Sequence, residues 1–253
     1  MTPLPITTDT LIDPAAFAAR IEAAGRARGF RVEHFGEVTG VPLLALTKRT
    51  PGPRARIYLS AGIHGDEPAP PLALLDLIER GVFDQRAGWF LCPLLNPAGF
   101  LRRTRENAEG LDLNRDYKLL RSLEIQAHAR WLERQPNFDI TFHLHEDWEA
   151  TGFYLYELCA DSDRSLARIM IGSVAKTFPI EPAAVIDGRP VAERGIIRPV
   201  DDPLQREPWP ESIYLRAHHT KIGYTLESPS TQPLATRIGM LATAIEAALD
   251  RRG

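Results

Sequence analysis

The stretch from Arg56 to Pro68 constrains the fold of this chain more than any other. It reads Arg-Ile-Tyr-Leu-Ser-Ala-Gly-Ile-His-Gly-Asp-Glu-Pro. No residue from Ile57 to Ile63 is charged, which is typical of a strand that is covered on both faces of its sheet. Polar residues begin where this strand is expected to end, and in open α/β sheets ligands bind at the carboxyl ends of strands. The stretch therefore predicts a buried strand that leads into a functional turn.

His64 and Glu67 lie in that turn, on either side of Gly65 and Asp66. A turn with this spacing can direct an imidazole and a carboxylate to one point. Histidine nitrogen and carboxylate oxygen are typical zinc ligands, provided that a third ligand arrives from elsewhere in the chain. A single His-x-x-Glu pair is common, so the rest of the sequence must decide whether this pair is functional.

The composition is that of an ordinary globular domain. The chain has 253 residues, of which 44% are hydrophobic and 25% charged. No Ser/Gly-rich or charged linker divides it, so we expect a single domain over residues 1–253. The net charge is −3 and no long basic run occurs, which argues against a nucleic-acid partner.

The sequence contains no pattern typical of export or of membrane insertion. The N-terminus lacks a basic region followed by an apolar one, and no apolar run approaches the roughly 18 residues of a membrane span. The two cysteines, Cys92 and Cys159, have no metal-binding or redox spacing and are expected to be free thiols. These features predict a cytoplasmic protein that does not bind a membrane.

The hydrophobic pattern predicts an alternation of strands and helices. A helix is expected to begin at Asp13-Pro14 and to end no later than Gly29, because Asp is a favourable N-cap and Pro a favourable first residue. Further helices are expected at 72–80, 122–135, 163–177 and 234–249, and strands at 31–38, 41–48, 57–63, 89–95, 138–145, 152–159 and 221–227. Two segments, 100–116 and 179–210, have no clean periodicity and are expected to be irregular. The strand–turn–helix–strand unit after Arg56 fits a parallel crossover.

Polar residues gather at the expected ends of three strands and in the first irregular segment. The three strand ends carry His64, Asp66 and Glu67; His145, Glu146 and Asp147; and Glu227. The irregular segment adds Arg102, Arg105, Asp112, Asn114 and Arg115. Together these residues predict one site with a metal ion, a lone carboxylate and guanidinium groups for an anionic substrate.

The order of these motifs resembles the zinc metallocarboxypeptidases of the carboxypeptidase A type. The shared motifs are His64-Gly-Asp-Glu67, Asn96-Pro-Ala-Gly-Phe, Arg102-Arg-Thr-Arg105, Asp112-Leu-Asn-Arg115, Leu144-His145 and Thr225-Leu-Glu227. The resemblance is greatest to short bacterial members that trim murein peptides, and it spans roughly residues 56 to 230. It implies a three-layer α/β/α sandwich around a mixed, mostly parallel central sheet. It also implies one Zn²⁺ ion per chain.

The resemblance assigns the three metal ligands residue by residue. His64 and Glu67 match the first two ligands of the family, and His145 matches the third. His143 is an alternative third ligand, because both histidines lie on one face of an alternating strand. We prefer His145, which lies nearer the carboxyl end of the strand and fits the family spacing from Asp139.

The resemblance also assigns residues that support the metal and bind the substrate. Asp112 matches the residue that accepts a hydrogen bond from the second ring nitrogen of His64. Asn114 and Arg115 match the pair that binds the terminal carboxylate of a substrate, since an arginine fork meets a carboxylate in a bidentate manner.

The remaining assignments concern the chemical step. Arg105 matches the arginine that stabilises the oxyanion, with Arg102 as a supporting cation, and Glu227 matches the general base and acid. The family also places a tyrosine on a mobile loop some twenty residues before the base. Gln205 occupies about that distance here, and Tyr214 is a poor substitute, so this role is unfilled.

Three functions are consistent with these motifs. The first is a zinc metallocarboxypeptidase that hydrolyses an amide next to a free carboxylate in a small peptide, such as one derived from murein. The second is hydrolysis of small N-acyl amino acids, as in the related succinylglutamate desuccinylases and aspartoacylases. The third is a non-catalytic domain that binds peptide C-termini. The intact set of expected ligands, base and arginines favours an enzyme, and the strand from Asp139 to His145 favours the peptidase.

Overall fold

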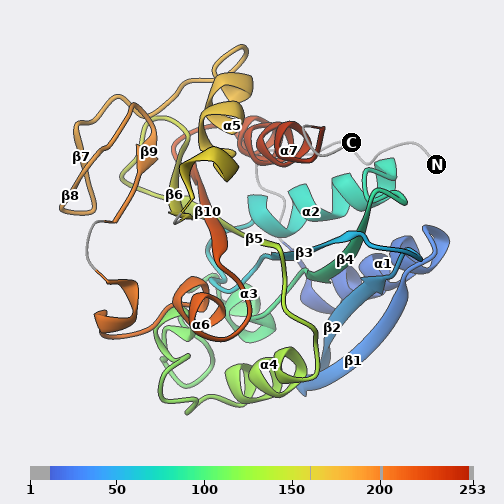
Figure 1. The fold of residues 1–253 in the computed structure, drawn as a ribbon. Helices are drawn as coiled ribbons and strands as arrows, with labels where there is room; N and C mark the ends of the chain where they lie inside the picture. The colour runs from blue at the N-terminus through green and yellow to red at the C-terminus, as the bar shows by residue number, and fades with distance from the viewer. Residues whose placement is uncertain (1–11, 160, 200–201, 251–253) are drawn as a thin grey trace.

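A computed structural model describes residues 12–159, 161–199 and 202–250 of the chain. Its centre is an eight-stranded sheet, with helices on both faces (Figure 1). The strand order across the sheet is β1-β2-β4-β3-β5-β10-β6-β9. The strands are β1 (Arg31–Val38), β2 (Val41–Lys48), β3 (Ala55–Ser60), β4 (Ala87–Cys92), β5 (Ile140–Asp147), β6 (Tyr154–Cys159), β9 (Ile196–Ile197) and β10 (Ile222–Pro229). Strands β7 (Val185–Ile186) and β8 (Arg189–Pro190) form a separate hairpin.

The sheet is mixed, with β4, β3, β5 and β10 parallel in its middle and a short parallel pair, β6 and β9, at its edge. Strand β3 runs parallel to both β4 and β5, and β5 runs parallel to β10. Strand β2 pairs antiparallel with β1 and β4, and β6 pairs antiparallel with β10. The predicted mixed sheet with a parallel core is therefore confirmed. The carboxyl ends of β3, β5 and β10 consequently lie next to one another at one edge of the sheet.

Two layers of helices cover the sheet and complete the predicted sandwich. One apolar cluster joins the sheet to α1 (Pro14–Ala27), α2 (Ala69–Arg80), α5 (Ala167–Val174) and α7 (Leu234–Asp250). A second cluster joins the opposite face to α4 (Leu123–Glu133) and α6 (Glu211–His218). The strands of the core alternate their side chains between these clusters, as Tyr58 and Leu59 of β3 illustrate.

Local sequence signals explain most helix boundaries. The side chain of Asp13 accepts hydrogen bonds from the backbone N–H groups of Ala15 and Ala16, so α1 begins where the sequence predicts. Helix α2 ends at Gly81, which has a left-handed φ of 78°. Among the described residues, no helix has the length and apolar composition needed to cross a membrane.

Several sequence predictions differ from the structure. The strands expected at 57–63 and 89–95 are β3 and β4, and each ends three residues earlier than predicted. The expected helix over 163–177 is shorter, because a 3-10 turn at Ser162–Arg164 precedes α5. Helix α3 (Pro97–Arg102) extends into the start of the segment 100–116 that we expected to be irregular, and the Asn96 side chain caps it and Pro97 begins it. Helix α6 has no counterpart among the predicted elements. The segment 179–210 is largely irregular as expected, with the β7–β8 hairpin, β9 and a 3-10 turn (Pro203–Gln205).

Candidate active site

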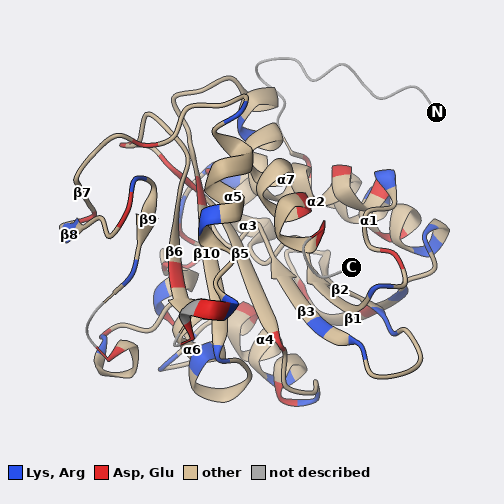
Figure 2. Cartoon of the chain, turned by 45° about the horizontal axis from the view of Figure 1, so that its top comes forward, with Lys and Arg blue, Asp and Glu red and all other residues tan. Residues whose placement is uncertain are grey.

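The neighbouring ends of β3, β5 and β10 open into a cleft with a volume of about 800 Å³. His64 and Glu67 reach it from the turn between β3 and α2, His145 from β5 and Glu227 from β10. Figure 2 shows that the middle strands are largely free of charged residues, whereas acidic and basic residues gather around α6 and the strand ends beside it. The cleft itself is lined by charged residues of both signs, among them Glu67, Arg105 and Glu227.

The turn that carries His64 is held by a close approach between two backbones. A Cβ atom at Gly65 would lie 2.0 Å from the carbonyl carbon of Gly99, so only glycine fits there. The Gly65 N–H donates to the Thr104 carbonyl (3.0 Å), and the Asn96 side chain donates to the Ile63 carbonyl (3.1 Å). The same asparagine that caps α3 therefore fixes the shape of the turn.

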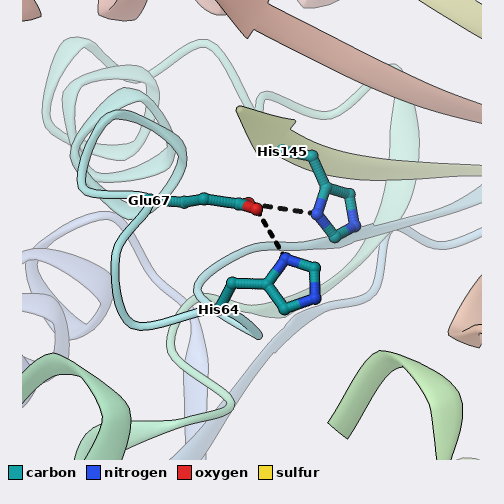
Figure 3. A group of neighbouring side chains, drawn as sticks. All are labelled: His64, Glu67 and His145. Carbon is teal, nitrogen blue, oxygen red and sulfur yellow. Dashed lines mark hydrogen bonds and ion pairs between the residues drawn. The ribbon is translucent and has the colours of Figure 1, made fainter. Parts of the chain in front are cut away.

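Three side chains in the cleft are arranged as metal ligands. His64 Nδ1 lies 2.5 Å from Glu67 Oε1, and His145 Nδ1 lies 3.1 Å from Glu67 Oε2. The Glu67 carboxylate thus lies between one nitrogen of each imidazole (Figure 3). The possible ligand atoms all lie within 4.8 Å of one another, and all three residues are buried. Two nitrogens and one oxygen, with access from a cleft, are a ligand set that can hold a metal ion.

The second nitrogen of His64 faces an outer carboxylate. His64 Nε2 lies 3.3 Å from Asp112 Oδ1, and Arg105 Nε donates to Asp112 Oδ2 at 2.9 Å. Burial by itself lowers the pKa of His64, but the carboxylates of Glu67 and Asp112 outweigh it and raise the pKa to about 9. A metal ion must therefore displace a proton from this ring, which couples metal binding to pH.

Arg105 connects the outer carboxylate to the ligands. Its Nη1 lies 3.6 Å from Glu67 Oε1 and 3.3 Å from His64 Nδ1. Since the side chain also lines the cleft, its positive charge lies at the cleft surface beside the candidate ligands.

Glu227 lies next to the ligand cluster without joining it. It pairs in register with His145 on one side of β10 and with Tyr154 on the other. Burial and the neighbouring carboxylates Glu67 and Asp147 raise the pKa of Glu227 well above its ordinary value. A carboxylate with a raised pKa can take up a proton and release it again, as a general base and acid must.

Asn114 and Arg115 also line the cleft, where they follow the outer carboxylate in a 3-10 turn at Leu113–Arg115. Asn114 Oδ1 accepts the backbone N–H of Glu211 (2.9 Å), and Asn114 Nδ2 lies 3.5 Å from His145 Nε2. The Arg115 guanidinium donates to the Asn114 carbonyl at 2.8 Å. These contacts keep both groups near the ligands.

Arg102 differs from the other predicted substrate-binding residues, Asn114 and Arg115, because it does not line the cleft. It is exposed in the last turn of α3, and its guanidinium donates to the Ala108 carbonyl at 2.7 Å. It is absent from the cleft lining. This hydrogen bond spans the loop after α3, where Arg103 has a left-handed backbone.

His143, the alternative ligand, points into a closed network below the cleft. Its Nδ1 lies 3.1 Å from Glu211 Oε2 and from Ser60 Oγ, and its Nε2 lies 3.1 Å from Thr141 Oγ1. All of its neighbours in this network are buried. The geometry therefore favours His145 over His143 as a metal ligand.

Sequence reasoning did not identify several residues that line the cleft. Tyr154 and Tyr156 project from β6, and their hydroxyls donate to Asp147 (2.7 Å) and Asp187 (3.4 Å). Tyr154 pairs with Glu227 across β6 and β10. An alignment of these two strands would therefore have placed the tyrosines beside the predicted base.

Two further arginines, Arg189 and Arg206, line the wall of the cleft beside Arg115. Burial and the nearby positive charges of Arg115 and Arg189 lower the pKa of Arg206. Among the described residues, none of these three arginines has a carboxylate within 4.0 Å. No sequence signal identified Arg189 or Arg206, since both lie in the irregular segment.

The sequence matches the model of one protein family. The catalytic-domain model of succinylglutamate desuccinylase/aspartoacylase matches residues 53–187, which is more than half of the chain. That range includes the three candidate ligands and Asp112, Asn114 and Arg115, and it ends before Glu227. A search of curated proteins finds no significant match.

Solved structures share the fold along nearly the whole chain. A candidate metallopeptidase from Shewanella amazonensis SB2B is 25% identical, with a TM-score of 0.80 and coverage of 93% of this chain and 91% of that one. A metallo-carboxypeptidase from Burkholderia cenocepacia is 19% identical (TM-score 0.70; 92% and 67% covered). Bovine thrombin-activatable fibrinolysis inhibitor, solved with a tick carboxypeptidase inhibitor, is 12% identical (TM-score 0.67; 97% and 98% covered). The last two show the fold alone.

Proposed function

This chain belongs to the succinylglutamate desuccinylase/aspartoacylase family, and from that premise we propose that it is a zinc-dependent hydrolase that cleaves an amide bond next to a free carboxylate. The observation that carries the proposal is the convergence of His64, Glu67 and His145 in one cleft with Glu227 beside them. The substrate that we propose is a small peptide, cleaved at its C-terminal end as by a carboxypeptidase.

His64 Nδ1, a Glu67 oxygen and His145 Nδ1 would hold the ion. When bound, zinc supplies Lewis acidity, which activates a water molecule and polarises a carbonyl group. Asp112 accepts a hydrogen bond from His64 Nε2, which selects the tautomer with a free Nδ1 lone pair.

Glu227 removes a proton from the attacking water and then delivers it to the amine nitrogen that leaves. The Arg105 guanidinium faces the negative charge that develops on the carbonyl oxygen, an interaction whose loss costs about 10²–10³ in rate in comparable sites. Arg115 and the Asn114 amide nitrogen bind the free carboxylate, which fixes the amide relative to Glu227.

A second candidate substrate is a small N-acyl amino acid. The family match favours it, because the family is named for a desuccinylase and an aspartoacylase. Arg189 and Arg206 also add positive charge to the cleft wall beside Arg115. Both candidates share the free carboxylate and the amide, and they differ in what lies on the acyl side.

The test is a panel assay with zinc-loaded protein. One arm contains dipeptides and murein-derived peptides, the other contains N-acetyl and N-succinyl amino acids, and each compound is paired with its C-terminal amide. We expect turnover in one arm, loss of turnover with a chelator, and little turnover of the amides. Equal turnover of acids and amides would contradict the proposal. A protein that binds no zinc and hydrolyses nothing would instead be a binding domain.

A further inference from the structure

A second buried carboxylate, Glu211, lies below the cleft. It is the first residue of α6, and only 1% of its surface is exposed. Tyr58 donates its hydroxyl to Glu211 Oε1 at 2.7 Å, Ser60 donates to Oε2 at 2.7 Å, and His143 Nδ1 lies 3.1 Å from Oε2. Each carboxylate oxygen therefore has at least one donor from a strand in the middle of the sheet.

The donors are themselves part of a closed network. Tyr58 Oη lies 3.0 Å from His128 Nε2, and Tyr117 Oη lies 2.7 Å from His128 Nδ1. Burial by itself raises the pKa of Glu211, but His143 and the hydrogen bonds outweigh it and lower the pKa to about 2. A buried charge is costly unless every lone pair is satisfied, so a network of this kind is expected to hold α6 in one position.

The backbone of Glu211 contacts a residue of the proposed site. Its N–H donates to Asn114 Oδ1 at 2.9 Å, and this bond settles the orientation of the Asn114 amide. With the oxygen held by Glu211, the amide nitrogen faces the other way and lies 3.5 Å from the candidate ligand His145, and Asn114 is part of the cleft lining. Asn114 therefore presents donors, not an acceptor, to an anion in the cleft.

The first turn of α6 also forms part of the cleft. Pro210, Ser212 and Ile213 all line it, and they flank Glu211 in sequence. Glu211 points the opposite way into the network. One residue thus links the wall of the cleft to strands β3 and β5.

We infer that Glu211 is a positioning residue for substrate binding. Its carboxylate locks the first turn of α6 to Tyr58, Ser60 and His143, and its N–H turns the Asn114 amide nitrogen toward the carboxylate of the substrate. The inference rests on the proposed function, in which Asn114 binds that carboxylate. It adds a residue outside the cleft that sets the affinity for the anion without touching it.

The test compares Glu211→Gln with wild type in zinc-loaded protein. Calorimetry measures the Kd of succinate, a dicarboxylate probe, and kinetics measure KM and kcat for the best substrate of the panel. We expect Kd and KM to rise about tenfold, which corresponds to one misplaced hydrogen bond to a charged group, while kcat and zinc content stay near wild type. A purely structural role would instead lower kcat and zinc content together and leave KM unchanged, and that result would overturn the inference.

A double-mutant cycle tests whether Glu211 acts through Asn114. In an Asn114→Ala background, Glu211→Gln should change the Kd of succinate less than about twofold, because the interaction that it positions is already gone. Additive effects of the two substitutions would overturn the inference.

A second variant covers the case in which Glu211→Gln does not fold. Tyr58→Phe removes only one donor from Glu211 Oε1 and should raise the Kd and KM in the same direction. Tyr117→Phe is the matched control, because this hydroxyl belongs to the same network but contacts His128 and not Glu211. Equal effects of the two variants would overturn the inference.

The two proposals fail in different ways. If wild type binds succinate and Glu211→Gln weakens that binding, while no compound in the panel is hydrolysed, only the proposed function is wrong. If wild type hydrolyses its substrate with an unchanged KM in Glu211→Gln, only the inference is wrong. If wild type does not bind succinate at all, no anion site exists for Glu211 to position, and the inference is overturned.

Discussion

Two buried carboxylates on the same side of the sheet, Glu67 and Glu211, have different surroundings. Glu67 and Glu211 each lie beside an imidazole from β5, His145 for the first and His143 for the second. These histidines are two residues apart and project from one face of the strand. The residue types at the two clusters are therefore nearly the same.

The difference lies in the other contacts and in access. Glu211 accepts hydrogen bonds from two hydroxyls in a closed network, so donors already satisfy its charge. Glu67 is shared between two ring nitrogens at the edge of a cleft. Once His64 loses its proton, the three ligand atoms can all be acceptors and can share a metal ion, whereas the Glu211 carboxylate is already satisfied by hydroxyl donors. A His/Glu pair is thus a candidate metal site only where donors are lacking and a ligand can enter.

The largest expected effect concerns Glu227, the carboxylate next to the candidate metal ligands. Glu227→Gln should lower turnover by about 10²–10⁴, because the variant cannot transfer a proton. Zinc content, measured by metal analysis, should not change. Glu149→Gln is the comparison, since Glu149 is an exposed acid at the rim of the same cleft. Loss of activity in Glu149→Gln but not in Glu227→Gln would reassign the base.

The next effect separates the two carboxylates directly. Glu67→Gln should weaken zinc binding by at least about a hundredfold, since loss of a ligand must exceed the 10–100-fold cost of losing an outer partner. Glu211→Gln, the same substitution in the closed network around His143, should leave zinc affinity unchanged. Competition with a chromogenic chelator measures both. Equal zinc affinities in the two variants would mean that Glu67 is not a ligand.

The residues that contact the histidines of the two sites, Asp112 and Thr141, should also have different effects when they are substituted. Asp112→Asn should lower zinc affinity about 10–100-fold, because it weakens the hydrogen bond that orients His64. Thr141→Val removes the hydroxyl next to His143 Nε2 and should cost about 1–3 kcal/mol of stability with zinc affinity retained. Denaturant unfolding and zinc titration of both variants decide between these outcomes.

The smallest expected effect is the pH dependence of the folding stability that the Glu211 carboxylate contributes. The folded pKa of Glu211, about 2, lies below its ordinary value of 4.5, with burial opposing the shift and His143 favouring it. A lowered carboxylate pKa stabilises the fold above the unfolded pKa, and this contribution is lost as the pH falls from 4.5 toward 2. The stability advantage of wild type over Glu211→Gln should therefore shrink in that window, as measured by urea unfolding. A constant advantage would indicate that Glu211 is not charged in the fold.

The sequence located the strands of the core because their environment is uniform. Strands covered on both faces exclude charged residues, so the runs before His64 and after Trp89 were visible without a structure. The resemblance then implied a mixed, mostly parallel sheet in a three-layer sandwich, and it named His64, Glu67 and His145, which lie together in the cleft. These features depend on local patterns, which sequence carries directly.

The helix α6 and the cleft wall could not be predicted, because tertiary contacts decide them. Glu211 is a charged residue that a sequence pattern assigns to the surface, yet the network at Tyr58 and Ser60 buries it. Likewise, Arg102 and Arg105 belong to one arginine-rich motif, and only the turn at the end of α3 directs one to the cleft and the other to solvent.

The sequence by itself determined which residue types are present and which segments form the buried strands, since hydrophobic burial acts through local patterns. The sequence and its resemblance already favoured His145 over His143, but only the tertiary structure shows that His143 faces a closed network. The tertiary structure also decided which arginines reach the wall. The physical reason is that hydrogen-bond partners of buried polar groups come from residues distant in the chain, and their positions exist only once the sheet has formed.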